Sequence, residues 1–486
     1  MKIGFDSKKY LKLQRDKIRE KIKMFDKLYL EFGGKLVDDY HAARVLPGFM
    51  PDIKIKLLQE LKDEAEVILC INANDIERNK IRADRIISYD MEVFRLIEFL
   101  RGVGITINNV VITLFNNQQG VNQFINKLND YNVTSYIHTF TKGYPTDVDT
   151  IVSEEGYGAN PYVKTSKPLV VVSAPGACSG KLATSLSQLY HEYKNGVKAG
   201  YAKFETFPVW DLPLKHPVNI AYEAATADIN DKNMIDYFHL EKYGVTAVNY
   251  NRDLEIFPVL KEILFKITNE NVYYSPTDMG VNVIGKCIVD NDVIVEASKD
   301  EIIRRYYKAM VDFKKGLVDK EVPNRIKILM NELGISENDR IVATKALEKK
   351  KSSGKPSACI CIGKKYITGR QTTLLTPISS TIINAIKYST KIPDDVDLLS
   401  PKILEPILKL KDKTLNFKEY TLNLNEVLLA LSICSVTNPI ITKSLDNLSK
   451  LNGCQLHATY IIPDIELQIL NNLGINSTCD PEANIK

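Results

Sequence analysis

The sequence KPLVVVSAPGACSGKLATSLSQLYHE occupies residues 167–192, and it predicts a buried strand, a Gly-rich turn and a helix. Residues 169–172 are apolar and mostly β-branched, which is typical of a strand that is covered on both faces of a parallel sheet. Residues 173–180 are rich in Ser, Pro and Gly, so we expect neither a strand nor a helix there. After Lys181, leucines return at helical spacing. The order of strand, turn and helix predicts an α/β fold built around this segment.

Such a turn directs several backbone N–H groups and the positive end of the helix dipole toward one point, where an anion is stabilised. The phosphate-binding loop pattern is G-x-x-x-x-G-K-[ST], and Gly180 and Lys181 match its end. Pro175 takes the place of the first Gly, and Leu182 replaces the hydroxyl residue that would hold magnesium. We therefore expect a P-loop-like phosphate site without standard magnesium coordination, formed by Gly176, Ser179, Gly180 and Lys181.

A purely structural interpretation of the same turn is also open. Ser179 could cap the helix beneath a tight connection between strand and helix, because Ser is a favoured N-cap residue. The local sequence does not distinguish this cap from an anion site.

Length and composition restrict the class of protein. The 486 residues suggest two to four domains, and 44% hydrophobic with 26% charged residues is typical of globular proteins. No apolar run approaches the ~18–20 residues of a membrane span, and the charged amino terminus lacks a signal-peptide core. These features predict a cytoplasmic protein that does not contact membranes.

The charge balance and the cysteines exclude further classes. A net charge of +4 from 64 basic and 60 acidic residues does not favour nucleic acid as a partner. The eight cysteines are scattered without a CxxC pair, so neither a zinc site nor a disulfide framework is expected, and no metal ligands are predicted. A homo-oligomer is compatible with the sequence.

Strand and helix patterns alternate along the amino-terminal half, which predicts right-handed crossovers and a three-layer, P-loop-like parallel sheet. We expect an α/β domain over residues 1–231, a mostly helical middle region over 232–323, and a second α/β domain over 324–486. The predicted strands of the first domain are 27–32, 66–71, 109–114, 135–140, 169–172 and 202–210.

Polar residues after these strands are candidates for contacts with a second substrate, since α/β proteins place ligands at the carboxyl edge of the sheet. His41 and Arg44 follow the first strand, and Arg78 and Arg82 follow the second. For His41 and Arg44, the alternative is a capped helix in which Arg44 pairs with a neighbouring acid. For Arg78 and Arg82, the alternative is an exposed charged loop.

Acidic residues give a second group of candidates. Asp211 follows the predicted strand 202–210, where an acid could hold a metal through water, and we expect it to act with Lys181 in catalysis. Asp147 and Asp149 lie in a long loop rich in Gly and Pro, and Asp278 lies in a polar Gly/Pro segment. Turn formation is the competing role for the loop aspartates.

The carboxyl-terminal part has the strand and helix order of a nucleobase deaminase, but it lacks the zinc motif H-x-E with P-C-x-x-C. A peptidase is not supported either, because the chain has no G-x-S-x-G elbow and no HExxH motif.

Several long blocks together resemble a known family. They include KLYLEFGGKL, DDYHAARVLPGF, INANDIERNKIRAD, KGYPTDVDTIVSEEGYG, SAPGACSGK and YYSPTDMGVN. In this order they are similar to the bacterial uncharacterised protein family 0371, also called domain of unknown function 1846. The resemblance covers nearly the whole chain. It implies a multi-domain cytosolic α/β protein with a nucleotide-fold-like amino-terminal part, and it implies no particular reaction.

The favoured hypothesis is a protein that binds a nucleotide such as ATP, or another phosphorylated small molecule, and uses it in phosphoryl or nucleotide-dependent chemistry as a transferase or hydrolase. The alternative is a non-catalytic protein that senses a phosphorylated metabolite, or an assembly protein whose Gly-rich turn is only structural.

Overall fold

The computed structural model describes residues 2–37, 39–82, 87–416 and 421–482, and it divides into two compact units. The first unit contains residues 2–223 and 230–298, and the second contains residues 224–229 and 299–486. Residues 232–298 of the predicted middle region thus belong to the first unit, and 299–323 belong to the second. Within the described residues, every helix is too short or too polar to traverse a lipid bilayer.

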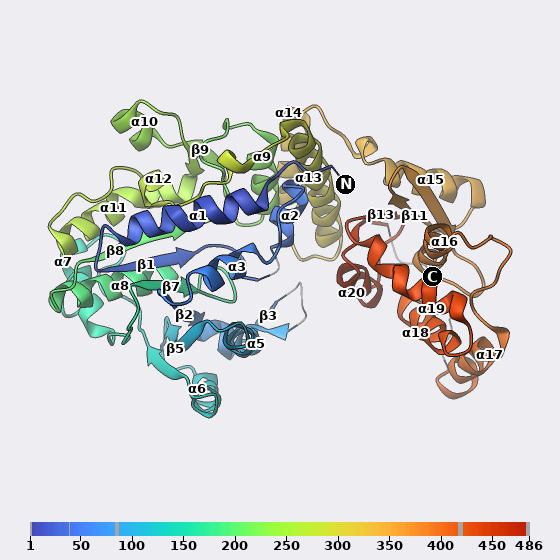
Figure 1. Ribbon diagram of the computed structural model, residues 1–486, viewed down its shortest axis with the longest axis horizontal. Coiled ribbons are helices and arrows are strands. Elements are labelled where there is room, and N and C mark those ends of the chain that lie inside the picture. Colours follow the sequence, from blue (N-terminus) through green and yellow to red (C-terminus); the bar gives the residue numbers. More distant parts are fainter. Residues whose placement is uncertain (1, 38, 83–86, 417–420, 483–486) are drawn as a thin grey trace. The chain divides into compact units, whose positions relative to one another are not determined.

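A six-stranded sheet forms the centre of the first unit, and all of its strand pairs are parallel (Figure 1). The order across the sheet is β6-β5-β2-β7-β1-β8. Its strands are β1 (Lys27–Phe32), β2 (Ala65–Asn72), β5 (Thr106–Thr113), β6 (Thr134–Ile137), β7 (Leu169–Ser173) and β8 (Ala199–Phe204). The predicted parallel α/β sheet is therefore confirmed for this part of the chain.

β7 lies inside the sheet between β2 and β1, and every one of its residues is buried. Val170 and Val172 face a core that contains Leu186 and Leu189 of the following helix, while alternate residues face the other side of the sheet. Burial on both faces explains why the strand is apolar without alternation.

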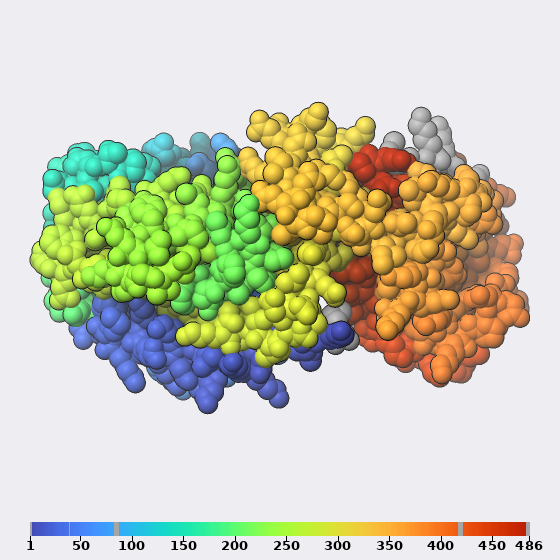
Figure 2. Space-filling model, turned by 90° about the horizontal axis from the view of Figure 1, so that it is seen from above, coloured from blue at the N-terminus to red at the C-terminus, as the bar shows by residue number. Residues whose placement is uncertain are grey.

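The helices of the first unit connect and cover these strands. α8 and α11 pack on one face, whereas α1 contacts β1 and α5 contacts β2 and β5. α1 buries Tyr10, Gln14 and Ile18, and its outer side (blue) lies on the surface in Figure 2. The helices are α1 (Ser7–Ile22), α2 (Tyr40–Val45), α3 (Ile53–Glu60), α4 (Ala73–Glu77), α5 (Tyr89–Gly102), α6 (Gly120–Asp130), α7 (Val148–Ile151), α8 (Lys181–Lys194), α9 (Pro217–Ala225), α10 (Tyr237–Tyr243), α11 (Asn251–Thr268) and α12 (Pro276–Met279).

The first unit also contains two short antiparallel pairs of strands. β3 (Ile81–Arg82) pairs with β4 (Ile87–Ser88), and β9 (Asn233–Ile235) pairs with β10 (Val248–Tyr250).

The predicted strand 202–210 is wrong in its bounds, since β8 ends at Phe204. Phe207 and Val209 are nevertheless buried, which gave this stretch its strand-like pattern. Pro208 has no N–H group for a strand ladder, so the chain packs here as a buried loop.

The second unit has a mixed four-stranded sheet in the order β12-β11-β13-β14. β11 is antiparallel to β12 and β13, and β13 is parallel to β14. The strands are β11 (Ser357–Ile362), β12 (Lys365–Arg370), β13 (Gln455–Ala458) and β14 (Asn476–Cys479). The expected second α/β part is confirmed at this level.

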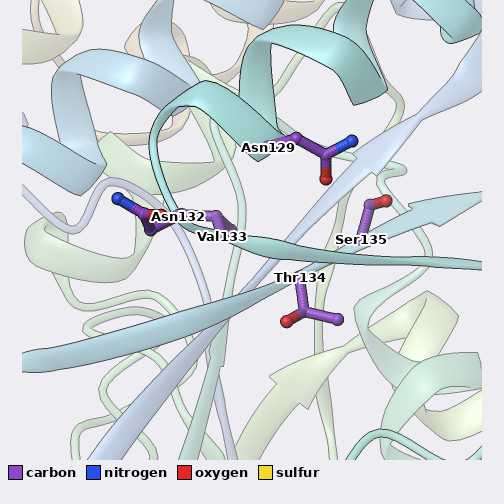
Figure 3. A pocket seen from close by; sticks show the side chains of 5 residues that line it. All are labelled: Asn129, Asn132, Val133, Thr134 and Ser135. Atoms are coloured by element: carbon purple, nitrogen blue, oxygen red, sulfur yellow. The ribbon is translucent and has the colours of Figure 1, made fainter.

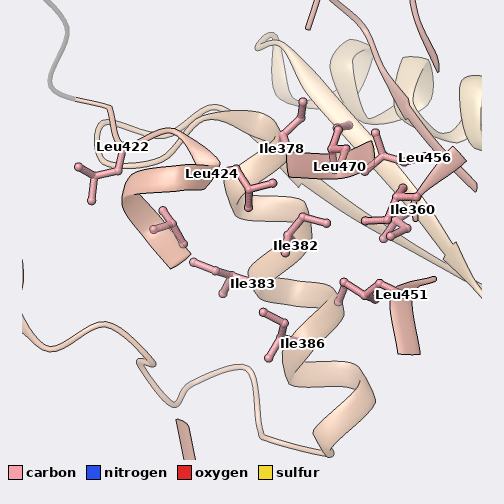
Figure 4. Close-up of a cluster of buried hydrophobic side chains, with 14 of the residues drawn as sticks. Ile360, Ile378, Ile382, Ile383, Ile386, Leu422, Leu424, Leu451, Leu456 and Leu470 are labelled. Atoms are coloured by element: carbon pink, nitrogen blue, oxygen red, sulfur yellow. The ribbon is translucent and has the colours of Figure 1, made fainter. Parts of the chain in front are cut away.

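The core of the second unit lies between this sheet and its helices. Figure 4 shows Ile378, Ile382 and Ile386 of α16 beside apolar residues from α18, α20 and the strands. α13 (Asn291–Lys314) begins in the residues of the first unit and ends in those of the second. The helices that follow it are α14 (Glu321–Glu332), α15 (Ile341–Ser353), α16 (Pro377–Thr390), α17 (Pro401–Lys409), α18 (Leu424–Ser435), α19 (Pro439–Asp446) and α20 (Asp464–Asn472).

Candidate functional site

The predicted phosphate turn lies where the sheet changes its winding direction. From β2 the chain continues outward to β5 and β6, whereas from β7 it continues in the opposite direction to β8, and β2 and β7 are neighbours. In open α/β sheets, ligands bind at the carboxyl ends of strands at such a switch point. The turn that follows β7 is therefore in the position where a ligand is expected from topology alone.

Two residues of the turn have left-handed backbone conformations, Cys178 with φ +56° and Gly180 with φ +77°. A Cβ atom at Gly180 would lie 2.8 Å from the side chain of Thr113, and one at Gly176 would lie 2.5 Å from the ring of Tyr89. Gly180 is required by both its left-handed backbone and the Cβ of Thr113, whereas a side chain at position 176 would have to displace the ring of Tyr89. The turn is packed on these two sides, while Ala177 and Cys178 are exposed.

The carbonyl groups of the turn are directed into the protein. Thr113 Oγ1 donates to the carbonyl of Ser179 at 2.9 Å, and Ser179 Oγ donates to the carbonyl of Gly176 at 2.8 Å. Asn72 Nδ2 makes a longer contact of 3.5 Å with the carbonyl of Cys178. In a planar trans peptide, the C=O group and the following N–H group point in opposite directions. The N–H groups of Ala177, Ser179 and Gly180 therefore point away from these donors.

The first turn of α8 adds further N–H groups. The N-cap residue is Gly180 rather than Ser179, and no side chain caps this end of the helix. The first intrahelical bond joins the Thr184 N–H to the Gly180 carbonyl, so the amides of residues 181–183 precede the regular hydrogen-bond pattern. The hydroxyl of Ser179 bonds inside the turn, and none of the described backbone hydrogen bonds is donated by its amide.

Lys181 extends along the carboxyl edge of the sheet. Its ammonium nitrogen lies 3.8 Å from Glu31 Oε1 near the end of β1, and the two side chains are 13% and 11% exposed. Tyr201 on β8 donates its hydroxyl to Glu31 Oε2 at 2.9 Å. Glu31 thus connects the positive end of α8 with the neighbouring strand β8.

A second charged group lies at the end of β8. Lys203 Nζ lies 2.6 Å from Asp253 Oδ2, at the start of α11, and 3.2 Å from Glu205 Oε2. These three side chains are 23%, 24% and 27% exposed, so solvent reaches them. Burial alone would lower the pKa of Lys203, but Asp253, Glu205 and Glu31 raise it above its usual value. Next to this group, Arg252 forms a bidentate ion pair with the buried Asp231.

His41 of α2 lies beside the same edge of the sheet. Its ring packs edge-on against Phe207 at 5.3 Å and Tyr222 at 5.7 Å between ring centroids. Asp39 caps α2 and lies 3.2 Å from the ammonium of Lys54. Burial tends to raise the pKa of Asp39, but the charges of Lys54 and His41 hold it below its usual value.

Comparison with known proteins matches both units to one family. Residues 3–334 match the model described as domain of unknown function DUF1846, N-terminal, and residues 338–486 match the C-terminal model of the same family. A UPF0371 protein of Clostridium botulinum strain Langeland is 55% identical over 492 aligned residues, which cover 99% of this chain and 98% of the relative. A UPF0371 protein of strain Eklund 17B is 55% identical over 491 aligned residues, with the same coverage.

The chain belongs to the DUF1846 family. The resemblance found in the sequence blocks is confirmed, and it covers the full length.

The other predicted site residues of this DUF1846 chain are not gathered at the turn. Asp211 lies seven residues after the end of β8, and a Cβ on Gly285 would lie 2.0 Å from its carboxylate oxygen. Burial raises the pKa of Asp211, and the charge of Lys286 opposes this shift. The acid that directly follows β8 is Glu205, so Glu205 has the strand-end position that the sequence had assigned to Asp211.

The loop aspartates have structural partners. Asp147 caps α7 and accepts hydrogen bonds from the Thr150 amide and hydroxyl, and Asp149 pairs with Lys266. Asp278 completes the capping box of α12 and accepts the hydroxyl of Tyr243 at 3.0 Å.

The three arginines that we expected to contact a second substrate lie on three different elements. Arg44 is in the last turn of α2 and is half-buried, and Arg78 is the exposed C-cap of α4. Arg82 belongs to β3, and its side chain lies outside the described part of the structure.

Sequence reasoning missed Glu31, Lys203, Glu205, Arg252 and Asp253. A usable signal exists for the first two, because each is a charged residue inside an otherwise buried strand. Such a charge requires a partner on a neighbouring element.

One surface hollow lies away from this edge. It is lined by Asn129, Asn132, Val133, Thr134 and Ser135, at the amino-terminal end of β6 (Figure 3). The turn lies at the opposite, carboxyl edge of the sheet, and no side chain lining the hollow is titratable. We therefore place the candidate site at the turn and not at this hollow.

Proposed function

We propose that this chain binds a nucleotide or another phosphorylated small molecule at residues 176–181. The phosphate would accept hydrogen bonds from the amides of Ser179, Gly180 and Lys181, and the ammonium of Lys181 would stabilise its charge. The observation that carries this proposal is the orientation of the turn. Its carbonyls are bonded inward and its amides, with the uncapped end of α8, point the other way.

The charged side chains around the turn support chemistry as well as binding. Lys181 and Lys203 supply positive charge, while Glu31, Glu205 and Asp253 supply groups that could position a nucleophile. We therefore favour an enzyme that acts on the phosphorylated ligand or uses it as a donor in transfer or hydrolysis.

A non-catalytic sensor of a phosphorylated metabolite is the second candidate. Leu182 provides no hydroxyl for magnesium, and Lys181 is already paired with Glu31. Both features weaken the metal-assisted phosphoryl transfer of a standard phosphate loop. Release of phosphate or nucleotide product during incubation separates the enzyme from the sensor.

The proposal is tested by calorimetric titration with pyrophosphate, ATP, ADP and a set of sugar phosphates. Lys181→Ala should weaken binding of the best ligand at least tenfold, which corresponds to about 1.4 kcal/mol. Lys194→Ala is the matched control, because this lysine lies at the other end of α8 in an exposed pair with Glu154. Absence of binding to every probe, or equal binding by both variants, would overturn the proposal.

A further inference from the structure

The group at the end of β8 contains more acid than base. Lys203 lies between Asp253 and Glu205, and Glu31 is close enough to act on the charge of both Lys203 and Glu205. With Lys181 on the far side of Glu31, two ammonium groups are shared among three carboxylates. The next cations, Arg252 beside Asp253 and Lys54 at the carbonyl of Gly33, are engaged by Asp231 and Asp39. One carboxylate of the group is therefore without a full counter-charge, although all three lie in a partly desolvated edge.

The contacts of the three carboxylates indicate which one has the least counter-charge. Asp253 has the shorter contact with Lys203, at 2.6 Å against 3.2 Å for Glu205. Glu31 has Lys181 and the hydroxyl of Tyr201 as partners. Although the ammonium of Lys181 is farther from Glu31, at 3.8 Å, Glu31 does not share it with a second carboxylate in a shorter contact. Glu205 shares Lys203 with the closer Asp253 and has no hydroxyl partner among the described contacts, so its charge is the least compensated of the three.

The backbone at Gly33 leaves room for the side chain of Glu205 beside β1. A Cβ atom on Gly33 would lie 2.3 Å from Glu205 Cγ and 2.6 Å from its Oε1. Glycine directly after β1 therefore leaves the space that the Glu205 side chain fills, next to the strand that carries Glu31.

We propose that Glu205 is the proton-exchanging residue of this site and takes up a proton when an anion binds at the turn of residues 176–181. This inference rests on the proposed function. An incoming phosphate increases the negative charge at an edge that already has one carboxylate too many, and protonation of Glu205 removes that excess. The ligand class is thus a phosphorylated compound that binds together with a proton.

The surrounding groups support Glu205 as the proton acceptor near neutral pH. Burial raises the pKa of Glu205 to about 7, with Lys203 opposing and with Asp253 and Glu31 adding to the shift. Tyr201, Tyr222 and Tyr250 also face Glu205 electrostatically, and burial raises the pKa of each above its usual value, so they remain protonated. His41 packs on Tyr222, and histidine is a side chain that titrates in this range, so it needs a control of its own.

The first experiment follows the carboxyl groups in the free protein by ¹³C NMR after labelling of glutamate. One resonance should titrate near neutral pH, and it should be absent from Glu205→Gln and still present in His41→Asn. If every glutamate titrates in the ordinary range near pH 4–5, the inference is wrong, whether or not the protein binds anions.

The second experiment measures proton uptake by titrating sulfate in buffers of different ionisation enthalpy at pH 7.5. Sulfate is the probe because it does not itself titrate in this range. Wild type and His41→Asn should take up a fraction of a proton per sulfate, and Glu205→Gln should take up none while still binding sulfate. Gly33→Ala, which would displace Glu205, should also reduce the uptake.

The outcomes separate the two proposals. Sulfate binding without proton uptake in the wild type would overturn the role of Glu205 and leave the phosphate site intact. No binding of sulfate, pyrophosphate or any nucleotide would overturn the proposed function, and with it the coupling of Glu205 to a ligand.

Discussion

The ammonium nitrogen of Lys181 lies 3.8 Å from Glu31 Oε1, and both side chains are almost buried. The cation that the turn would offer to a phosphate is therefore partly neutralised by the neighbouring strand. An anion bound at the turn, as we propose, would compete with Glu31 for this lysine.

Glu31→Gln should consequently strengthen anion binding. The amide keeps an oxygen for the hydroxyl of Tyr201 but removes the negative charge beside Lys181. Sulfate should bind roughly threefold to tenfold more tightly, which corresponds to about 1 kcal/mol of reduced repulsion. Calorimetric titration at constant ionic strength measures the change.

Glu66→Gln is the control for this prediction. Glu66 is also a buried carboxylate in the sheet, but it lies at the amino-terminal end of β2 and accepts the amides of Ser166 and Lys167. The Glu66→Gln variant should bind sulfate with the same affinity as the wild type. Weaker sulfate binding by Glu31→Gln would show that Glu31 supports the anion site and does not oppose it.

Glu192 should contribute strongly to the stability of the first unit. This α8 carboxylate is 1% exposed and accepts Lys27 Nζ at 2.7 Å and the hydroxyls of Tyr29 and Tyr162 at 2.7 and 2.9 Å. Glu192→Ala leaves these donors without their shared acceptor, and we expect the free energy of unfolding to fall by about 3 kcal/mol.

The only tryptophan of the chain, Trp210, lies in the first unit, so its fluorescence during urea unfolding measures this effect. Glu154→Ala removes the partner of Lys194 on the same helix, but that pair is exposed. It should change the free energy of unfolding by less than about 0.5 kcal/mol. Equal effects of the two substitutions would contradict the structural role of Glu192.

The order of strand, turn and helix at residues 169–194 could be predicted from the sequence because its signals are local. The apolar run of β7, the glycine at position 180 and the helical spacing after Lys181 each act within a few residues. The parallel sheet followed from the same kind of pattern, since strands buried on both faces are continuously apolar.

The charged edge could not be predicted in the same way. Glu31, Lys203 and Lys181 meet because β1 lies between β7 and β8, and this order is set by long-range packing. A local pattern was also misleading at Phe207 and Val209, where buried loop residues resembled a strand. In the second unit the sequence gives no strand signal for β14, because this strand is short and its sequence NSTC has little apolar character.

Arg340 should be essential for the stability of the second unit. Its side chain is 1% exposed, and it donates to Asp300 at 2.7 Å, to Thr478 Oγ1 at 2.8 Å and to the Asn476 carbonyl at 2.8 Å. Arg340→Lys cannot reproduce this planar set of donors and should cost about 3 kcal/mol or more.

Hydrogen exchange measured by mass spectrometry on peptides from β13 and β14 reports this loss locally. Lys345→Ala is the control, since Lys345 forms an exposed pair with Glu348. If protection of β13 and β14 is the same in Arg340→Lys as in the wild type, the side chain has no such role.

His138 should make the stability of the first unit depend on pH. It is buried, and its Nε2 lies 3.1 Å from the carbonyl oxygen of Pro161. Burial lowers its pKa to about 4, with the Pro161 carbonyl opposing the shift and His191 adding to it. In the unfolded chain the pKa is about 6.5, so between about pH 6.5 and pH 4 the unfolded state binds more protons. The contribution of neutral His138 is complete above this range and is lost as the pH falls through it, to a limit on the order of 3 kcal/mol.

His138→Gln removes the titrating group and keeps an amide that can donate to Pro161. The urea midpoint followed by Trp210 fluorescence should therefore fall less steeply between pH 7 and pH 4.5 in this variant than in the wild type. Other groups also titrate in this range, so the decisive quantity is the difference between the two slopes. Identical slopes would mean that His138 becomes protonated inside the folded protein without a cost, which its burial against Pro161 does not permit.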